Sequence, residues 1–326
     1  MRIEAKSSEK AQRSLNFAGS AFLPSLASLR FFAALYVACW HVSLVWQNFS
    51  FFAAFSRAGW IGVSFFFILS GFVLMWNFNI DGNKKDFICR RIARIYPLHW
   101  LCLFIVIALY LATGKGMSGY HGNYIETFAN FLLVHDWVLI GNIAQTWNGV
   151  SWTLSCEWFF YLVAVFLFMR MLKARHELHW ILISLWILLV MLNIISLTQG
   201  WAGMSKFMHM HPVFRLFEFT VGAYGAMLVK NGFKFRNRFF ALTLSTVPIA
   251  LYCLLGSRPY GNFLISAVMP GFLLLIISFA NLDISAQKLW THSTRLVLLG
   301  ESSYSFYMLH AIILGVTNSF ILRRIL

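Results

Sequence analysis

The stretch from Ser28 to Trp46 is a long apolar run that only two strongly polar residues interrupt, Arg30 near its beginning and His41 eleven residues later. Eleven residues make about three turns of an α-helix, so both side chains fall on one face, about 16 Å apart along the axis. If the run crosses a membrane, His41 lies near the middle of the hydrocarbon. An ionisable group is costly at that depth, which predicts a functional site. The alternative is a buried histidine that bonds to a neighbouring helix.

The composition is that of a membrane protein. Of 326 residues, 60% are hydrophobic and only 11% are charged, whereas soluble domains carry about 25% charged residues. We therefore expect an all-α polytopic bundle of transmembrane helices in a lipid bilayer. The net charge of +15 would suggest nucleic acid in a soluble chain, but in a membrane protein it sets topology, so no nucleic-acid partner is expected. The five cysteines are scattered singly, without metal-ligand spacing or a disulfide pattern, and no metal is expected.

The apolar segments predict nine spans, with a tenth left open. They cover residues 28–47, 60–78, 96–112, 152–169, 179–198, 213–229, 239–256, 263–280 and 303–321. Lys and Arg gather in the tail 1–24, the loop 84–94 and the segments 170–175 and 230–238. The positive-inside rule places these segments in the cytoplasm. We therefore expect a cytoplasmic N-terminal tail, 1–24, and one membrane domain, 25–326.

Two segments fit this topology poorly. Residues 124–140 are apolar enough for a helix but contain four polar residues, and a span here would put the basic segment 170–175 outside. We expect an interfacial or re-entrant element on the outer side, which is tolerable where its polar backbone faces protein or water. At the other end of the chain, Arg323 and Arg324 would lie outside, which a tenth span or a re-entrant final segment would explain.

The basic loop offers a candidate anion site. Arg91 and Arg94 are three residues apart and share a face if the next helix begins early. Arginine forks suit phosphate groups. From charge alone, however, ordinary positive-inside bias and contact with lipid head groups explain the loop better.

Polar residues also enter the later spans. Glu157 lies near the outer end of the span 152–169, where its carboxylate would either orient or deprotonate a partner, or pair with a buried arginine. Tyr304, Tyr307 and His310 follow a three-residue step and form one polar stripe, which taken alone favours a structural role.

Two further patterns are interpreted as structural. Arg215 and Glu218 are three apart and predict an ion pair within one helix. Ser70-Gly71 is a small pair that permits close approach of two helices.

Five motifs occur in order along most of the chain, LRFFAALYVACWH, GVSFFFILSGFVL, RRIARIYPLHW, SWTLSCEWFFYL and SYSFYMLH. Together, from about residue 23 to about 315, they resemble the acyltransferase-3 family of integral-membrane O-acyltransferases. The resemblance implies transfer of an acyl group, acetyl by default, from cytoplasmic acyl-CoA to a hydroxyl of a cell-envelope or exported glycan. It also implies a place in the bacterial cytoplasmic (inner) membrane.

The resemblance also assigns roles. His41 matches the catalytic histidine and Arg30 its partner arginine, with Glu157 as a further catalytic residue. The residues implied in binding the acyl-CoA donor are Arg90, Arg91, Arg94, Tyr304 and His310.

Three departures from the family pattern are expected to matter. The usual final span is missing or very short here, and no periplasmic hydrolase-like domain is expected, so a second transfer step would need a separate periplasmic partner. Position 64, often acidic in relatives, is Ser64, which weakens any role assigned there.

Two other classes compete with this reading. A transporter or flippase for a lipid-linked sugar would show inverted repeats, and no internal repeat is evident. A structural or assembly subunit would tolerate substitution of Arg30 and His41, which is hard to reconcile with their place in hydrocarbon.

Overall fold

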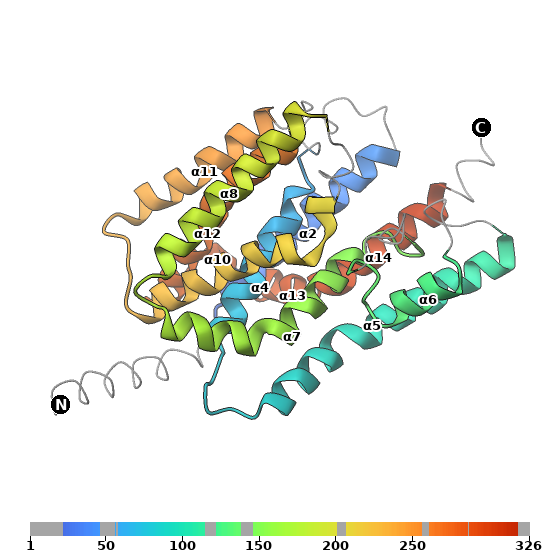
Figure 1. Cartoon of the computed structure of the whole chain (residues 1–326), viewed down its shortest axis with the longest axis horizontal. Helices are drawn as coiled ribbons and strands as arrows, with labels where there is room; N and C mark the ends of the chain where they lie inside the picture. The colour runs from blue at the N-terminus through green and yellow to red at the C-terminus, as the bar shows by residue number, and fades with distance from the viewer. Residues whose placement is uncertain are drawn as a thin grey trace.

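The computed structural model describes residues 22–45, 56, 58–114, 122–137, 146–200, 207–255, 261–285 and 287–318. These residues form helices joined by turns, with no strand among them (Figure 1). The long helices are α2 (Pro24–Val45), α4 (Ile61–Trp76), α5 (Lys84–Thr113), α7 (Trp152–Lys173), α8 (Leu178–Thr198), α10 (Pro212–Lys230), α11 (Arg238–Leu255), α12 (Gly261–Ile284) and α14 (Ser303–Val316). The short ones are α6 (Tyr124–Phe131), η2 (Trp290–His292) and α13 (Thr294–Glu301).

Every expected span has a helix in the structure, but not every helix has the length of a span. Six described helices are long and apolar enough to cross a membrane: α2, α5, α7, α8, α10 and α12. The pair α13 and α14 adds a seventh only if it is one span, bent by 61°. The all-helical membrane fold is therefore confirmed. The count of nine to ten spans and the cytoplasmic N-terminus stay predictions, and residues 1–21 and 319–326 lie outside the described part.

The basic segment 84–94 differs from the expectation of a loop. It forms the first turns of the 30-residue helix α5, which begins twelve residues before the predicted span. Asn83 caps this helix by accepting a hydrogen bond from the Lys85 backbone N–H, and Asp86 lies in the first turn, where negative charge is favourable. A 30-residue helix is about 45 Å long, so one end extends beyond the hydrocarbon.

Helix α4 lies in the middle of the bundle (Figure 1). All of its residues except Phe66 and Val73 are buried. It packs most closely on α10, where a Cβ at Gly71 would lie 1.8 Å from the Phe219 carbonyl oxygen and a Cβ at Gly222 would lie 1.8 Å from the Ile68 carbonyl oxygen. The two backbones therefore touch, as the small pair Ser70-Gly71 predicted.

A polar cluster holds the beginning of α2. Asp283 of α12 accepts hydrogen bonds from the backbone N–H and the hydroxyl of Ser25, at 3.0 and 2.5 Å. Ser28 donates to the Thr291 carbonyl oxygen at 2.6 Å. Because Arg30 follows two residues later, these bonds fix the level and rotation at which its side chain leaves the helix.

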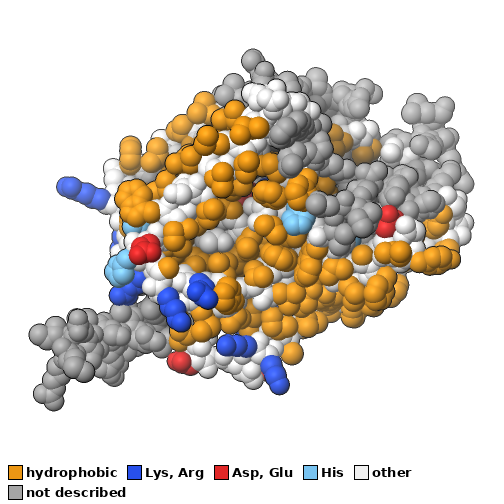
Figure 2. Space-filling view, in the orientation of Figure 1, with side chains coloured by type: hydrophobic (Ala, Val, Ile, Leu, Met, Phe, Trp, Pro, Cys, Tyr) orange, Lys and Arg blue, Asp and Glu red, His pale blue; other side chains and the backbone are white. Residues whose placement is uncertain are grey.

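The surface is mostly apolar, as a lipid-facing protein requires. Figure 2 shows hydrophobic side chains over most of the visible face, with Lys and Arg gathered toward its lower left. Helix α8 is the extreme case, because most of its apolar side chains are exposed, Trp180 and Leu188 among them. An exposed apolar surface of this extent matches a bilayer rather than water.

The described part of the segment 124–140, residues 124–137, does not form a span. Its helix α6 has eight residues, about 12 Å, which is too short to cross hydrocarbon. Asn123 and Glu126 form a capping box at its beginning. A turn then leads to Trp137, and residues 138–145 lie outside the described part.

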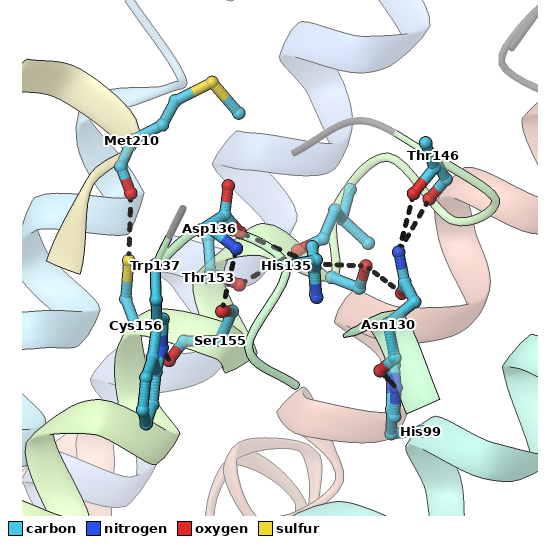
Figure 3. A network of polar contacts seen from close by, with 12 residues as sticks. His99, Asn130, His135, Asp136, Trp137, Thr146, Thr153, Ser155, Cys156 and Met210 are labelled. Atoms are coloured by element: carbon cyan, nitrogen blue, oxygen red, sulfur yellow. Dashed lines mark hydrogen bonds and ion pairs between the residues drawn. The ribbon is translucent and has the colours of Figure 1, made fainter. Parts of the chain in front are cut away.

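Buried hydrogen bonds tie this element to α5 and α7 (Figure 3). His99 of α5 donates from Nε2 to the Asn130 carbonyl oxygen at 2.8 Å, and Asn130 Nδ2 donates to Thr146 Oγ1 at 2.7 Å. The Asp136 backbone N–H donates to Ser155 Oγ at 3.3 Å. The polar residues of the segment are thus satisfied largely by protein, the condition under which such an element is tolerated in a membrane.

The Asp136 carboxyl is not satisfied in this way. It is buried, its Oδ2 lies 3.4 Å from His135 Nε2, and neither oxygen has a hydrogen-bond partner among the described residues. Burial raises the pKa of the Asp136 carboxyl well above its ordinary value. The folded protein therefore favours the neutral acid.

Gly71→Ala tests the contact between α4 and α10. The added methyl group overlaps the Phe219 backbone, so the helices must separate, at a cost of about 3 kcal/mol. We expect a clearly lower thermal unfolding temperature in detergent. Gly149→Ala is the matched control, because a Cβ there meets nothing within 4 Å. Equal unfolding temperatures for the two variants would contradict this packing.

Asp136→Asn tests the neutral carboxyl. A raised pKa means that the folded protein binds a proton that the unfolded chain has released, so wild-type stability falls as pH rises above the ordinary carboxyl pKa. Asparagine does not titrate. We expect the variant to unfold at a higher temperature than wild type at pH 8, with the gain shrinking toward pH 5. Asp81→Asn is the control, because Asp81 is exposed. If Asp136→Asn does not raise the unfolding temperature at pH 8, the Asp136 carboxyl is not neutral in the folded protein.

Candidate active site

Five helices, α2, α4, α5, α7 and α14, enclose a cavity in the bundle. Its empty volume is about 770 Å³, a figure that includes the part open to solvent. The polar lining residues are Arg30, Ser70, Arg94, Thr153, Glu157, Tyr161, Ser303, Tyr304 and Tyr307. The rest of the lining is apolar and comes mainly from α4, with Val63, Phe66, Phe67, Val73 and Leu74.

The charged groups of this cavity leave it net positive. Arg30 of α2 and Arg94 of α5 face the single carboxylate of Glu157 on α7. Glu157 Oε1 accepts a hydrogen bond from Ser70 Oγ at 3.1 Å, and no arginine forms an ion pair with it in the described part of the chain. Glu157 is thus bound by a serine, and the two guanidinium groups of the same cavity are left to bind other groups. The site therefore suits an anionic ligand.

The remaining arginines of the basic segment lie outside the lining. The Arg91 guanidinium lies 5.8 Å from the centre of the Tyr161 ring, and Tyr161 itself lines the cavity. Arg91 thus contacts a residue of the cavity wall without lining the cavity itself. Arg90 is exposed and has no place in the lining.

The stripe on α14 forms one wall. Tyr304 donates from its hydroxyl to the Ile95 carbonyl oxygen of α5 at 2.7 Å. The Tyr307 hydroxyl accepts from Thr153 Oγ1 of α7 at 3.2 Å. These bonds hold α14 against both neighbours, so the two tyrosines combine the expected structural role with a place on the cavity.

His41 and His310 do not line the cavity but contact one another. His310 Nε2 lies 3.1 Å from His41 Nδ1, and the ring centroids are 5.0 Å apart. His310 is buried and bonds through Nδ1 to the Tyr307 carbonyl oxygen, at 2.5 Å. The His41 ring therefore faces another helix, and Tyr307 connects this histidine pair to the cavity.

The predicted ion pair between Arg215 and Glu218 is present. Arg215 Nη1 lies 2.9 Å from Glu218 Oε1, and Arg215 Nη2 donates to Ser64 Oγ at 3.2 Å. Both charged residues are buried, and neither lines the cavity. Ser64 thus has a structural partner on α10.

Sequence reasoning gave no site role to five polar residues that line the cavity, Ser70, Thr153, Tyr161, Ser303 and Tyr307. Ser70 was interpreted as a packing residue, yet it holds Glu157. Tyr161 lies four residues after Glu157, a spacing that places both on one helix face and could have identified it. Tyr307 was assigned to a structural stripe, and only the fold shows that it connects the cavity to the histidine pair. For metals, no group of three His, Cys, Asp or Glu side chains that could hold an ion occurs in the described part.

Comparison with known proteins gives a family for this arrangement. The chain matches the family of the acyltransferase domain over residues 23–325. It is 30% identical to acyltransferase MdmB of Streptomyces mycarofaciens, over 90% of this chain and 79% of that protein. It is 24% identical to peptidoglycan O-acetyltransferase OatA of Listeria monocytogenes, over 44% of this chain but only 23% of that protein. No solved structure matches it.

The family match spans the five motifs and all five helices around the cavity, and the likeness to MdmB covers most of both chains. The chain therefore belongs to the acyltransferase family that its motifs indicated, and it is an O-acyltransferase.

Proposed function

We propose that the protein transfers an acyl group, acetyl by default, from acyl-CoA on the cytoplasmic side of the bacterial inner membrane to a hydroxyl of a cell-envelope or exported glycan. The observation that carries this proposal is the arrangement of the site. A cavity with two arginines is connected to a pair of imidazoles through Tyr307, whose side chain lines the cavity and whose carbonyl oxygen bonds to His310.

The donor fits the charge of the cavity. Coenzyme A has an anionic nucleotide end and a thin pantetheine arm, and guanidinium groups bind phosphate oxygens through paired hydrogen bonds. Arg30 and Arg94 would hold the anionic end, with Arg90 and Arg91 nearby on α5. His41 lies about 16 Å further along α2 than Arg30, a distance that an extended arm can span.

The reaction needs one base. The acceptor hydroxyl loses its proton to His41 Nε2 while its oxygen bonds to the thioester carbonyl carbon. The carbon–sulfur bond then breaks, and the leaving thiolate takes the proton from the imidazolium. An acyl-histidine route would use the same nitrogen, since His41 Nδ1 is already engaged by Val37 and His310.

The acceptor class rests on the relatives. OatA is named for peptidoglycan, a glycan outside the cytoplasmic membrane, and the resemblance in the motifs points to the same class of hydroxyl. The transporter alternative needs no thioester, so transfer of label from acyl-CoA separates it from this proposal.

His41→Ala tests the base. Because general-base catalysis is worth about 10²- to 10⁴-fold, we expect label transfer from radiolabelled acetyl-CoA to the glycan fraction of membranes to fall at least 100-fold. Thermal unfolding in detergent should show that the variant is folded. His179→Ala on α8 is the control, because His179 neither lines the cavity nor bonds to the pair. Transfer by His41→Ala at the control rate would remove His41 from the mechanism.

Arg94→Ala tests donor binding. Loss of one hydrogen-bonded charge pair costs about tenfold or more in affinity, so we expect the KM for acetyl-CoA to rise at least tenfold, with a smaller change in kcat. Arg170→Ala on α7 is the control, because Arg170 is also a helix arginine but packs on Phe166 and does not line the cavity. If both variants changed KM alike, Arg94 would be an ordinary membrane-facing charge.

A further inference from the structure

The hydrogen bonds of His310 determine where its proton lies. The Tyr307 carbonyl oxygen can only accept, so the His310 Nδ1 atom bonded to it carries the hydrogen. In a neutral imidazole the other nitrogen is then bare. That nitrogen, Nε2, lies 3.1 Å from His41 Nδ1.

The same reasoning places the proton of His41. Its Nδ1 lies between two acceptors, the bare His310 Nε2 and the Val37 carbonyl oxygen one turn earlier in α2, each at 3.1 Å. Both contacts require a hydrogen on His41 Nδ1. The bare nitrogen of His41 is therefore Nε2, the atom that must act as the base.

From this geometry we propose that His310 is a positioning residue for the transfer reaction, which keeps the proton of His41 on Nδ1 and stabilises the imidazolium that forms at His41. The inference rests on the proposed function and assigns His310 a role other than donor binding.

The proton balance of the reaction supports the need for such a partner. When His41 Nε2 takes the hydroxyl proton, the ring becomes a cation inside an apolar bundle. Its Nδ1–H then donates a charge-assisted hydrogen bond to His310 Nε2, which is stronger than a bond between neutral groups. The proton leaves again from His41 Nε2 to the departing thiolate, so His310 never changes its own protonation.

The Val37 carbonyl cannot replace this contact. It belongs to the same helix as His41 and accepts the backbone bond of that turn, so it restrains the ring without connecting it to the cavity. His310 instead comes from α14, and its Nδ1 is bound to Tyr307, whose side chain lines the cavity. Because contacts from both α2 and α14 hold the His41 ring, its Nε2 atom keeps one orientation.

Two amide variants separate the nitrogens of His310. In His310→Asn the amide is short and can replace Nδ1 toward the Tyr307 carbonyl, but it cannot reach His41. In His310→Gln the amide oxygen reaches the position of Nε2 and can accept from His41. We expect kcat for transfer from acetyl-CoA to fall about 10- to 100-fold in His310→Asn, to recover to within about fivefold of wild type in His310→Gln, and the KM for acetyl-CoA to stay within twofold in both.

His99→Gln is the control for losing a buried imidazole, because its amide can still donate to the Asn130 carbonyl oxygen, outside the pair. Thermal unfolding in detergent reports folding of each variant. Three results would overturn the proposal: wild-type kcat in His310→Asn, equal losses in His310→Asn and His310→Gln, or a rise in KM with kcat intact, which would return His310 to donor binding. If the wild-type protein transfers no label from acetyl-CoA, the proposed function itself is wrong. If the wild-type protein transfers label and His41→Ala does not, the proposed function holds, and the His310 variants then test the role of His310 alone.

Discussion

A polar group inside an apolar bundle must find its partner within the protein, and this constraint organises the structure. No water is at hand in hydrocarbon to replace a missing hydrogen bond, so an unsatisfied group there costs several kcal/mol. Arg215 meets part of that condition with Glu218 and Ser64, and Glu157 meets part of it with Ser70. Glu218 belongs to the same helix as Arg215, but Ser64 and Ser70 reach α10 and α7 from α4, so these two contacts also fix how the helices pack.

Close packing of α4 and α10 also fixes the arrangement of the helices, in addition to these hydrogen bonds. Where Gly71 and Gly222 let the two backbones touch, dispersion contacts and polar bonds across the helices become short enough to matter. Because α4 supplies much of the cavity wall, including Ser70, its position decides the shape of the site. The same pairing presents Ser64 to Arg215.

The charged side chains and the two imidazoles lie in different parts of the site. The arginines and Glu157 lie on the cavity, and the imidazoles lie beyond Tyr307, in contact with one another. Such a division suits the proposed donor, acyl-CoA, whose charged end and reactive end are far apart, because binding energy at the charged end would position the thioester without placing cations beside the proposed base. The proposed base, His41, would also lie in a region of low dielectric, where a hydrogen bond to a transient cation is strong.

The helical membrane fold could be predicted from the apolar segments alone, because only helices satisfy every backbone group within one such segment. The apolar segments also predicted the positions of the long helices to within a few residues, apart from the early beginning of α5 and the separate helix α13. Local spacing was sufficient for the pair Arg215–Glu218, since three residues along a helix bring two side chains together. The five motifs identified Arg30, Glu157 and Arg94 as candidate site residues, but they did not predict the distances between them.

Which helices contact one another could not be predicted from any one segment and became known from the fold. His41 and His310 are 269 residues apart, and no helical period connects them. Likewise, Ser70 reaches Glu157 across 87 residues, and Tyr304 reaches the Ile95 carbonyl across 209. Periodicity reports which side chains share a face of one helix, whereas the partner of that face depends on packing between helices, which no single segment encodes.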